Sequence, residues 1–364
     1  PLPIVEMGLF MDMDGIPIAF GITPGNENEQ GSMIPLEKKI LDDFSLSRFV
    51  VCTDSGLSSA TNRYFNTYDK QDGNRSFITT QSIKKLKSHL KKWALEPTGW
   101  YLSGSSSMTE YDIRELDDKE KIFFKSRWIK EKTEIHEDGK TKVIELEQQL
   151  VVSYSIKYRD YLRSIRNGQI ERAEKMIARG EGSTGRKRPN DPKRLIATDH
   201  ATQDGEVAKK AVSYINQKRI DEEEKYDGFY AVCTNLEDEP ETIIKVNKRR
   251  WQIEECFRIM KTDFEARPVY VKRKDRILAH FITCFIALIV YRYLEQKLDN
   301  KYTIDQILST LQEMDFVKYE GKGYQPIYTR TELTDALHEV FGFCTSKQIV
   351  PISKMRNICS LTKK

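Results

Sequence analysis

The pattern of apolar and polar positions predicts alternating strands and helices in the first 80 residues. The apolar runs Ile4–Met11 and Ile16–Ile22 flank the turn-forming segment Asp12–Gly15, which is typical of a β-hairpin. Apolar residues then recur every three or four positions over Ile34–Phe44, which predicts a helix. The continuous apolar run Phe49–Thr53 is typical of a strand buried on both faces of a sheet. The next two predicted elements are a helix and a short strand, over Ser58–Tyr68 and Ser76–Thr80.

Residues 81–226 break this alternation. Strands are predicted over Lys121–Ile129 and Val143–Tyr158, and helices over Tyr161–Ala178 and Glu206–Arg219. Beyond residue 226 the pattern becomes regular again and predicts a strand over Gly228–Thr234, a helix from about Thr242 to Lys261, a long apolar helix over Ile277–Tyr291, a helix over Ile304–Met314, a hairpin within Phe316–Arg330 and a helix over Leu333–Phe341. The apolar helix is shorter than the roughly 20 residues that span a bilayer, so we expect a buried core helix.

Composition adds a local charge. A length of 364 residues suits one large domain with an insertion, or two domains. The formal net charge is only +4, but between Lys245 and Arg276 there are 11 Lys and Arg against 5 Asp and Glu. Such a concentration favours a polyanionic partner such as nucleic acid. The six cysteines lack Cys-x-x-Cys spacing, which indicates reduced thiols and not zinc ligands or disulfides.

The helix expected at about Thr242–Lys261 carries the most specific pattern. On a continuous helix, Arg250, Glu254 and Lys261 share one face, beside an apolar stripe that includes Phe257. An acid at the edge of a buried stripe, with a cation on either side, suits a carboxylate that holds a divalent metal while the cations hold phosphates. The alternative is a solvated face of ion pairs, in which Glu254 pairs with Arg258 four residues later.

A second acid follows the buried strand Phe49–Thr53. Asp54 lies immediately after this strand, where the carboxyl ends of sheet strands form sites, and Ser55-Gly56 lets the chain turn away. The alternative is that Asp54 only orders an Asx turn. Trp251 is interpreted as a packing residue, and His280 as a hydrogen-bonded core histidine.

These residues resemble the Tyr-x2-Arg-x3-Glu-x6-Lys signature of bacterial DD(E) transposases of the insertion-sequence-four superfamily. Arg250, Glu254 and Lys261 match it in identity and spacing, and Asn247 stands at the tyrosine position. The segment around Asp54 resembles the second-aspartate motif of the same family, an apolar strand followed by Asp-x-Gly.

The resemblance implies an α/β fold with a ribonuclease-H-like core, that is, a mixed sheet flanked by helices. A β-containing insertion interrupts this core, and a small C-terminal α+β unit follows it. The expected division is a first core part at residues 1–80, an insertion at 81–226, a second core part at 227–299 that carries the Glu helix, and a C-terminal unit at 300–364. The chain starts at Pro1 directly before a strand, so we expect an N-terminal truncation that removes the first core strand.

The function implied by the resemblance is metal-dependent cleavage of DNA at element ends and strand transfer into target DNA. Asp54 and Glu254 would be catalytic metal ligands for Mg²⁺ or Mn²⁺, with two ions expected, while the first Asp would lie upstream of Pro1. The residues expected to contact DNA are Arg250, Lys261, Asn247, Lys248, Arg249 and Arg258. The implied partners are double-stranded DNA and a second copy of the chain in a synaptic homodimer, in the bacterial cytosol.

Three alternatives stay open at this point. The chain could be a DNA-binding remnant without catalysis, a related metal-dependent nuclease without strand transfer, or a protein whose cationic stretch binds another protein. An Asp encoded in an apolar strand upstream of Pro1 would favour the enzyme over the remnant. Salt-sensitive DNA binding would argue against the protein-interaction surface.

Overall fold

The computed structural model describes residues 4–27, 29–44, 49–67, 75–102, 109–137, 140–180, 190–201, 207–346 and 349–361. The chain divides into two compact units. One, which we call the sheet unit, contains Phe44–Arg249. The other, which we call the hairpin unit, combines Pro1–Asp43 with Arg250–Lys364.

A six-stranded mixed sheet forms the centre of the sheet unit, with the strand order β3-β4-β10-β7-β6-β5. β3 and β4 are parallel, whereas the other neighbouring strands are antiparallel. The strands are β3 (Phe49–Thr53), β4 (Arg75–Thr80), β5 (Tyr101–Leu102), β6 (Phe123–Glu137), β7 (Lys140–Tyr154) and β10 (Phe229–Thr234). The predicted mixed α/β class is confirmed, and the sheet is compatible with a ribonuclease-H-like fold.

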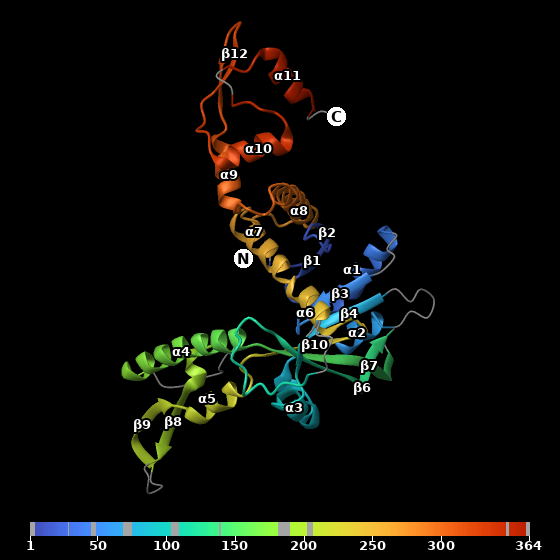
Figure 1. Cartoon of the computed structure of the whole chain (residues 1–364), viewed down its shortest axis with the longest axis vertical. Helices are drawn as coiled ribbons and strands as arrows, with labels where there is room; N and C mark the ends of the chain where they lie inside the picture. Colours follow the sequence, from blue (N-terminus) through green and yellow to red (C-terminus); the bar gives the residue numbers. More distant parts are fainter. Residues whose placement is uncertain are drawn as a thin grey trace. The chain divides into compact units, whose positions relative to one another are not determined.

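Helices cover both faces of this sheet because side chains alternate along each strand. Val232 of β10 packs with α6 (Pro240–Lys248), whereas the next residue, Cys233, packs on the face covered by α3 (Ser88–Leu95). The same alternation occurs in β4, β6 and β7. Figure 1 shows α3 and α6 on opposite sides of the sheet. Two-sided burial explains why β3 and β10 read as continuous apolar runs in the sequence.

Further elements extend the sheet unit. α2 (Ala60–Phe65) packs against the β6–β7 ribbon, where Tyr64 contacts a small cluster around Leu146. The remaining elements are α4 (Ile156–Ala178), β8 (Ile196–Ala201), β9 (Val207–Ile215) and α5 (Gln217–Glu224), with short 3-10 turns at Ile83–Lys85 and Pro192–Leu195. α4, α5 and the second turn share a separate small core that includes Ala173 and Ile220.

The hairpin unit is built on β1 (Val5–Met11) and β2 (Pro17–Pro24), which form a separate two-stranded antiparallel sheet. Its core contains buried residues of β1, α7 (Trp251–Thr262) and α8 (Lys274–Lys297). The other elements are α1 (Glu29–Asp43), α9 (Ile304–Glu313), β11 (Phe316–Tyr319), β12 (Gly323–Pro326), α10 (Glu332–Phe341) and α11 (Ile352–Leu361).

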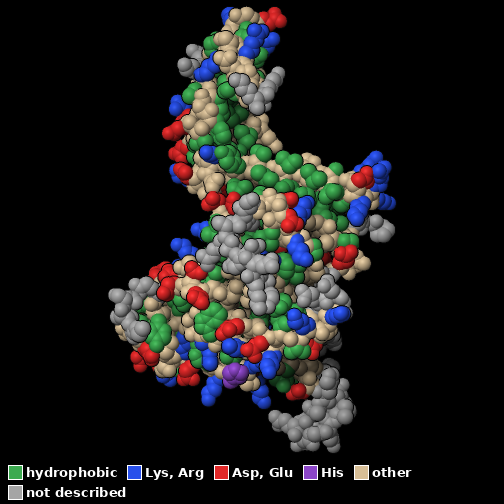
Figure 2. Space-filling view, turned by 90° about the vertical axis from the view of Figure 1, so that its right-hand side faces the viewer, with side chains coloured by type: hydrophobic (Ala, Val, Ile, Leu, Met, Phe, Trp, Pro, Cys, Tyr) green, Lys and Arg blue, Asp and Glu red, His purple; other side chains and the backbone are tan. Residues whose placement is uncertain are grey.

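The helix α8 is only partly the buried core helix that was predicted. Phe281 and Leu288 lie in the core of the hairpin unit, whereas Ile282, Ile286 and Val290 are exposed on another face of the helix. Figure 2 shows hydrophobic side chains gathered on the surface of this part of the chain. Among the described residues, α8 alone is long and apolar enough to cross a membrane, but a core helix of a soluble protein passes the same test.

Most predicted elements are present, although several of their bounds differ, and one predicted helix is instead a strand. The predicted helix over Glu206–Arg219 is instead strand β9, paired with β8, and the helix α5 begins only at Gln217. β-branched and aromatic residues, among them Val212 and Tyr214, favour the extended form in this segment. The sequence pattern also missed α3, α11, β8 and the short strand β5. The hairpin unit joins Pro1–Asp43 with Arg250–Lys364, and the four-part division at residues 80, 226 and 299 stays a prediction.

Gly228, at the start of β10, is a position where only glycine fits. Its φ is +85°, and a Cβ atom there would lie 2.7 Å from Cε2 of Tyr154 and 3.0 Å from the carbonyl oxygen of Ser155. We therefore expect Gly228→Ala to lower the free energy of unfolding by about 2 kcal/mol or more in urea denaturation. Gly168→Ala is the matched control, because a Cβ there meets no atom within 4 Å and α4 should gain about 0.5–1 kcal/mol. Equal unfolding curves for Gly228→Ala and the wild type would contradict this account.

Candidate active site

Asp54 lies at the carboxyl end of β3, as predicted. Its Oδ1 atom accepts the backbone N–H groups of Gly56 at 2.8 Å and Leu57 at 3.1 Å, which is the Asx-turn arrangement. Its Oδ2 atom has no hydrogen-bond partner in the described part of the chain, and the residue is exposed. The turn therefore fixes one carboxylate oxygen and leaves the other available to a ligand.

Two threonines hold the end of β3 against β4. The Thr53 hydroxyl donates to Oγ1 of Thr79 at 3.0 Å, and the Thr79 hydroxyl lies 3.3 Å from the carbonyl oxygen of Asp54. Thr53 and Thr79 are also paired in the parallel register of the two strands. Because both are buried, this contact fixes where the chain leaves the sheet and so where the Asp54 carboxylate lies.

The predicted helix over Thr242–Lys261 is not continuous. α6 ends at Lys248 and α7 begins at Trp251, with Arg249 and Arg250 between them. This interruption is also the boundary between the sheet unit and the hairpin unit. Arg250 keeps a helical backbone conformation directly before α7, so the spacing from Arg250 to Lys261 still describes one helical face.

The side chain of Asn247 is buried, so it is not open to the direct DNA contact that was expected of it. Asn247 lies in the last turn of α6, and only 1% of its surface is exposed. Its Nδ2 atom donates to the hydroxyl of Tyr230 on β10 at 2.5 Å, while its Oδ1 atom is buried without a partner in the described residues. Asn247 therefore supports a neighbouring side chain inside the sheet unit. Lys248, the next residue, is exposed.

The first two turns of α7 place an exposed acid beside a cation. Glu254 is 75% exposed, and its Oε1 atom lies 3.9 Å from Nη2 of Arg250. At that distance in water the pair is weak and leaves the carboxylate accessible. Lys261 is exposed in the last turn of the same helix. Trp251 is 57% exposed at the start of α7, so its interpretation as a packing residue is wrong.

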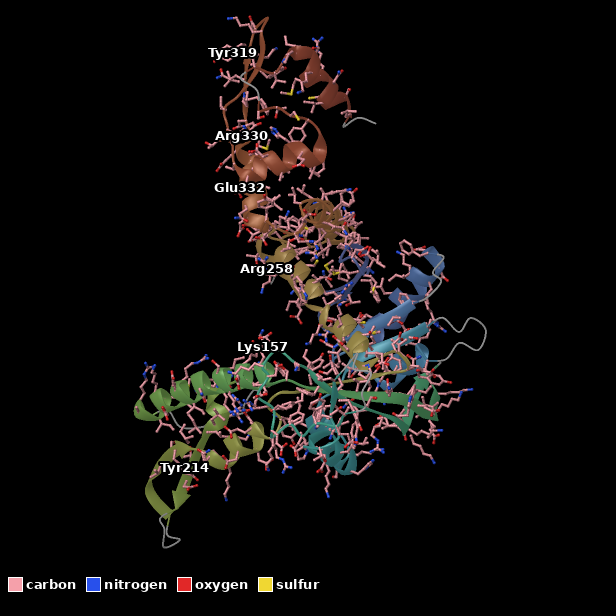
Figure 3. All side chains as sticks on the ribbon, viewed as in Figure 1. Lys157, Tyr214, Arg258, Tyr319, Arg330 and Glu332 are labelled. Atoms are coloured by element: carbon pink, nitrogen blue, oxygen red, sulfur yellow. The ribbon has the colours of Figure 1, made fainter. Side chains whose placement is uncertain are left out.

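Arg258 does not form the expected ion pair with Glu254. It pairs with Asp263, at 3.4 Å between Nη1 and Oδ2, and projects from α7 into solvent (Figure 3). The ion pair between Glu254 and Arg258, on which the alternative interpretation of a solvated face depended, is therefore not formed. Glu254 has Arg250 as its neighbouring cation, which is the less favourable order for a helix-stabilising pair.

A buried arginine fixes α7 in the hairpin unit. The Arg292 guanidinium on α8 is 4% exposed and donates to the carbonyl oxygen of Gly15 at 3.1 Å, to Glu295 at 2.6 Å and to Glu255 at 3.4 Å. Glu255 is the residue after Glu254, and Gly15 closes the β1–β2 turn. Burial raises the pKa of Glu295, although Arg292 opposes that shift. This cluster joins α7, α8 and the hairpin through Glu255, whereas Glu254 stays exposed.

The donor atoms suit a hard divalent cation. No group of three or more His, Cys, Asp or Glu gathers as a metal site in the described ranges. The two candidate acids each offer a carboxylate oxygen that is open or only weakly paired, and oxygen ligands are those that Mg²⁺ and Mn²⁺ prefer. Cys256 of α7 is fully buried, and burial raises the pKa of its thiol to about 11. Asp54 belongs to the sheet unit and Glu254 to the hairpin unit.

Two earlier predictions about single residues have clear outcomes. His280 is hydrogen-bonded through Nε2 to the carbonyl oxygen of Ala266 at 3.1 Å, as predicted for a core histidine. The cysteines in the described part of the chain are all free thiols. Neither group takes part in the candidate site.

Comparison with protein families identifies a matching family. The family described as "Transposase DDE domain" matches residues 5–290, which include Asp54 and the whole of α7. No curated protein and no solved structure matches the chain.

The Arg292 cluster can be tested by unfolding. Replacement of Arg292 by Met leaves Glu255 and Glu295 without their buried cation, so we expect a loss of about 3–5 kcal/mol in the free energy of unfolding. Arg273→Met is the matched control, because this arginine is 70% exposed and pairs with an exposed Asp275; its loss should stay below about 1 kcal/mol. Faster hydrogen exchange of α7 amides in Arg292→Met would locate the effect. Equal losses in the two variants would show that Arg292 is not an anchor.

Proposed function

Because the chain belongs to the DDE transposase domain family, we propose that it acts on DNA in transposition through a metal-dependent site that includes Asp54 and Glu254. The family supports a DNA transposase, with a role in DNA recombination and mobile elements. The observation that carries the residue assignment is α7, where an exposed Glu254 lies between Arg250 and Lys261 inside the matched region.

In this proposal each side chain has a distinct part in phosphoryl transfer. Asp54 and Glu254 supply carboxylate oxygens to Mg²⁺ or Mn²⁺, with two ions expected. Bound metal lowers the pKa of an attacking water or 3′-hydroxyl and stabilises the leaving oxygen. Arg250 binds phosphate through two parallel donors, and Lys261 binds it as a point charge. Lys248, Arg249 and Arg258 are exposed cations that bind the DNA backbone less specifically.

We further infer that the chain belongs to the insertion-sequence-four superfamily, on the spacing of Arg250, Glu254 and Lys261. In that superfamily a third carboxylate, the first Asp, completes the set. Cleavage at element ends, strand transfer and pairing of two copies across two DNA ends follow from the same membership. A cytosolic location also stays a prediction.

DNA binding tests the phosphate-binding cations. We expect the chain to bind duplex DNA with an affinity that falls steeply with salt, measured by fluorescence anisotropy at several NaCl concentrations. Arg250→Ala and Lys261→Ala should each reduce the slope of log Kd against log salt by about 0.9, the value for one lost phosphate contact in duplex DNA. Lys301→Ala removes an exposed lysine that pairs with Asp299 and should leave the slope unchanged.

The outcomes separate the alternative functions. Salt-insensitive or absent DNA binding by the wild-type chain would remove the proposed function and favour a protein-interaction surface. Plasmid nicking in Mg²⁺ without joined products would indicate a nuclease. DNA binding with unchanged slopes in both variants would reject Arg250 and Lys261 as phosphate ligands.

Metal binding tests the two acids. We expect Asp54→Asn and Glu254→Gln each to weaken Mn²⁺ binding by about tenfold or more. The binding is measured from the electron paramagnetic resonance signal of the free Mn²⁺ ion. If both acids bind the same ions, the double variant should lose little more than either single variant, because the effects are not additive. Asp305→Asn, an exposed acid in the first turn of α9, is the control. Additive small losses would show unrelated sites.

A further inference from the structure

Tyr230 lies on the same face of the sheet as the side chains that lead to Asp54. Strand alternation places Val50 and Cys52 of β3 against the cluster beneath α6, and Tyr230 of β10 packs against that same cluster. Every second residue of a strand faces the same side, so Asp54, two positions after Cys52, continues on that side at the end of β3. Tyr230 therefore belongs to the Asp54 side of the sheet and not to the side covered by α3.

Thr80 connects the two residues. The last parallel pair of β3 and β4 is Thr53 with Thr79, so Asp54 and Thr80 are the next positions on neighbouring strands. Neighbouring strands are about 4.8 Å apart. The Thr80 hydroxyl lies 3.0 Å from the hydroxyl of Tyr230. β4 lies between β3 and β10, so the Tyr230 hydroxyl lies next to Thr80, at the same edge of the sheet where Asp54 leaves it.

The Tyr230 hydroxyl is held from two sides. Asn247 of α6 donates to it at 2.5 Å, and Thr80 of β4 contacts it at 3.0 Å. Asn247 is 1% exposed and its Oδ1 atom is buried without a partner in the described residues. Tyr230 itself is partly exposed. Because Asn247 is buried and fixed in α6, its contact together with that of Thr80 holds this phenol in one orientation.

We propose that the Tyr230 hydroxyl, oriented by Asn247 and Thr80 at the same edge of the sheet as Asp54, binds the DNA backbone at the active site. This inference rests on the proposed function, since it takes Asp54 to hold metal against a DNA phosphate. A large share of protein–DNA hydrogen bonds go to phosphate and sugar oxygens, and Tyr is among the donors. A phenol that neighbouring groups already orient loses little conformational entropy on binding.

A neutral hydroxyl has a different signature from a cation. Loss of one hydrogen bond weakens binding by about two- to tenfold. It releases no counterion, so the dependence of affinity on salt should not change. Tyr230→Phe should therefore raise Kd for duplex DNA by about two- to tenfold at every salt concentration, with an unchanged slope of log Kd against log salt. Arg250→Ala changes that slope, which separates the two kinds of contact.

Tyr101→Phe is the matched control. Tyr101 is also in the sheet unit, is 39% exposed, and donates its hydroxyl to Glu110 at 2.6 Å. Its removal should leave DNA affinity unchanged. Asn247→Ala should weaken DNA binding through Tyr230, and the double variant Tyr230→Phe/Asn247→Ala should bind no more weakly than Tyr230→Phe. A structural role alone would lower the melting temperature of Tyr230→Phe and leave its Kd unchanged.

A measurement on the wild-type chain keeps the test independent of variant folding. Nitration of tyrosines by tetranitromethane, located by mass spectrometry, should be reduced at Tyr230 when duplex DNA is bound, and unchanged at Tyr101. If the wild-type chain binds no DNA, the proposed function fails. If it binds DNA while Tyr230→Phe keeps wild-type affinity, or while Tyr230 is nitrated equally with and without DNA, this inference alone is overturned.

Discussion

Burial of the central sheet on both faces is the constraint on which the site in the sheet unit depends. Val232 and Cys233 of β10 face opposite cores, so a shift of one residue would exchange the two sets of side chains. The same register brings Tyr230 to the Asp54 side and ends β3 where Thr53 meets Thr79. Apolar packing thereby determines where polar groups lie that contribute little to stability themselves.

The hairpin unit positions its acid by a different means. α7 buries Cys256, Ile259 and Met260 on one face, and Arg292 fixes Glu255 next to that face. The face that carries Glu254 stays in solvent. Burial of one face holds α7 in place. Exposure leaves the Glu254 carboxylate in contact with water, which a metal ion can replace.

The sequence was a reliable guide where periodicity and turn residues agreed. The β1–β2 hairpin, β3, β4 and α8 could be predicted because each has one apolar pattern bounded by turn or polar residues. It failed where tertiary contacts decide between two patterns. The segment at Val207–Ile215 is a strand because β8 is available to pair with it, and neither its composition nor its period shows that partner.

The candidate site was predictable to the same degree. Asp54 was found from its place after a buried strand, and Glu254 from its helical spacing. Tyr230 was missed, because a tyrosine inside an apolar strand looks like any other core residue; its contact with Asn247 spans 17 positions and exists only in the folded chain. Asn247 is therefore better understood as the partner of an aromatic hydroxyl on β10 than as a replacement for a tyrosine on the helix.

The interruption at Arg249–Arg250 has a consequence for how the motif tolerates changes in length. Inserting one residue inside α7 would turn Lys261 by about 100° around the helix axis relative to Glu254. Inserting one residue at the interruption would leave both helices in phase with their own cores. The spacing from Arg250 to Lys261 is thus constrained by a helix, whereas the spacing from Asn247 to Arg250 is set only by a short linker.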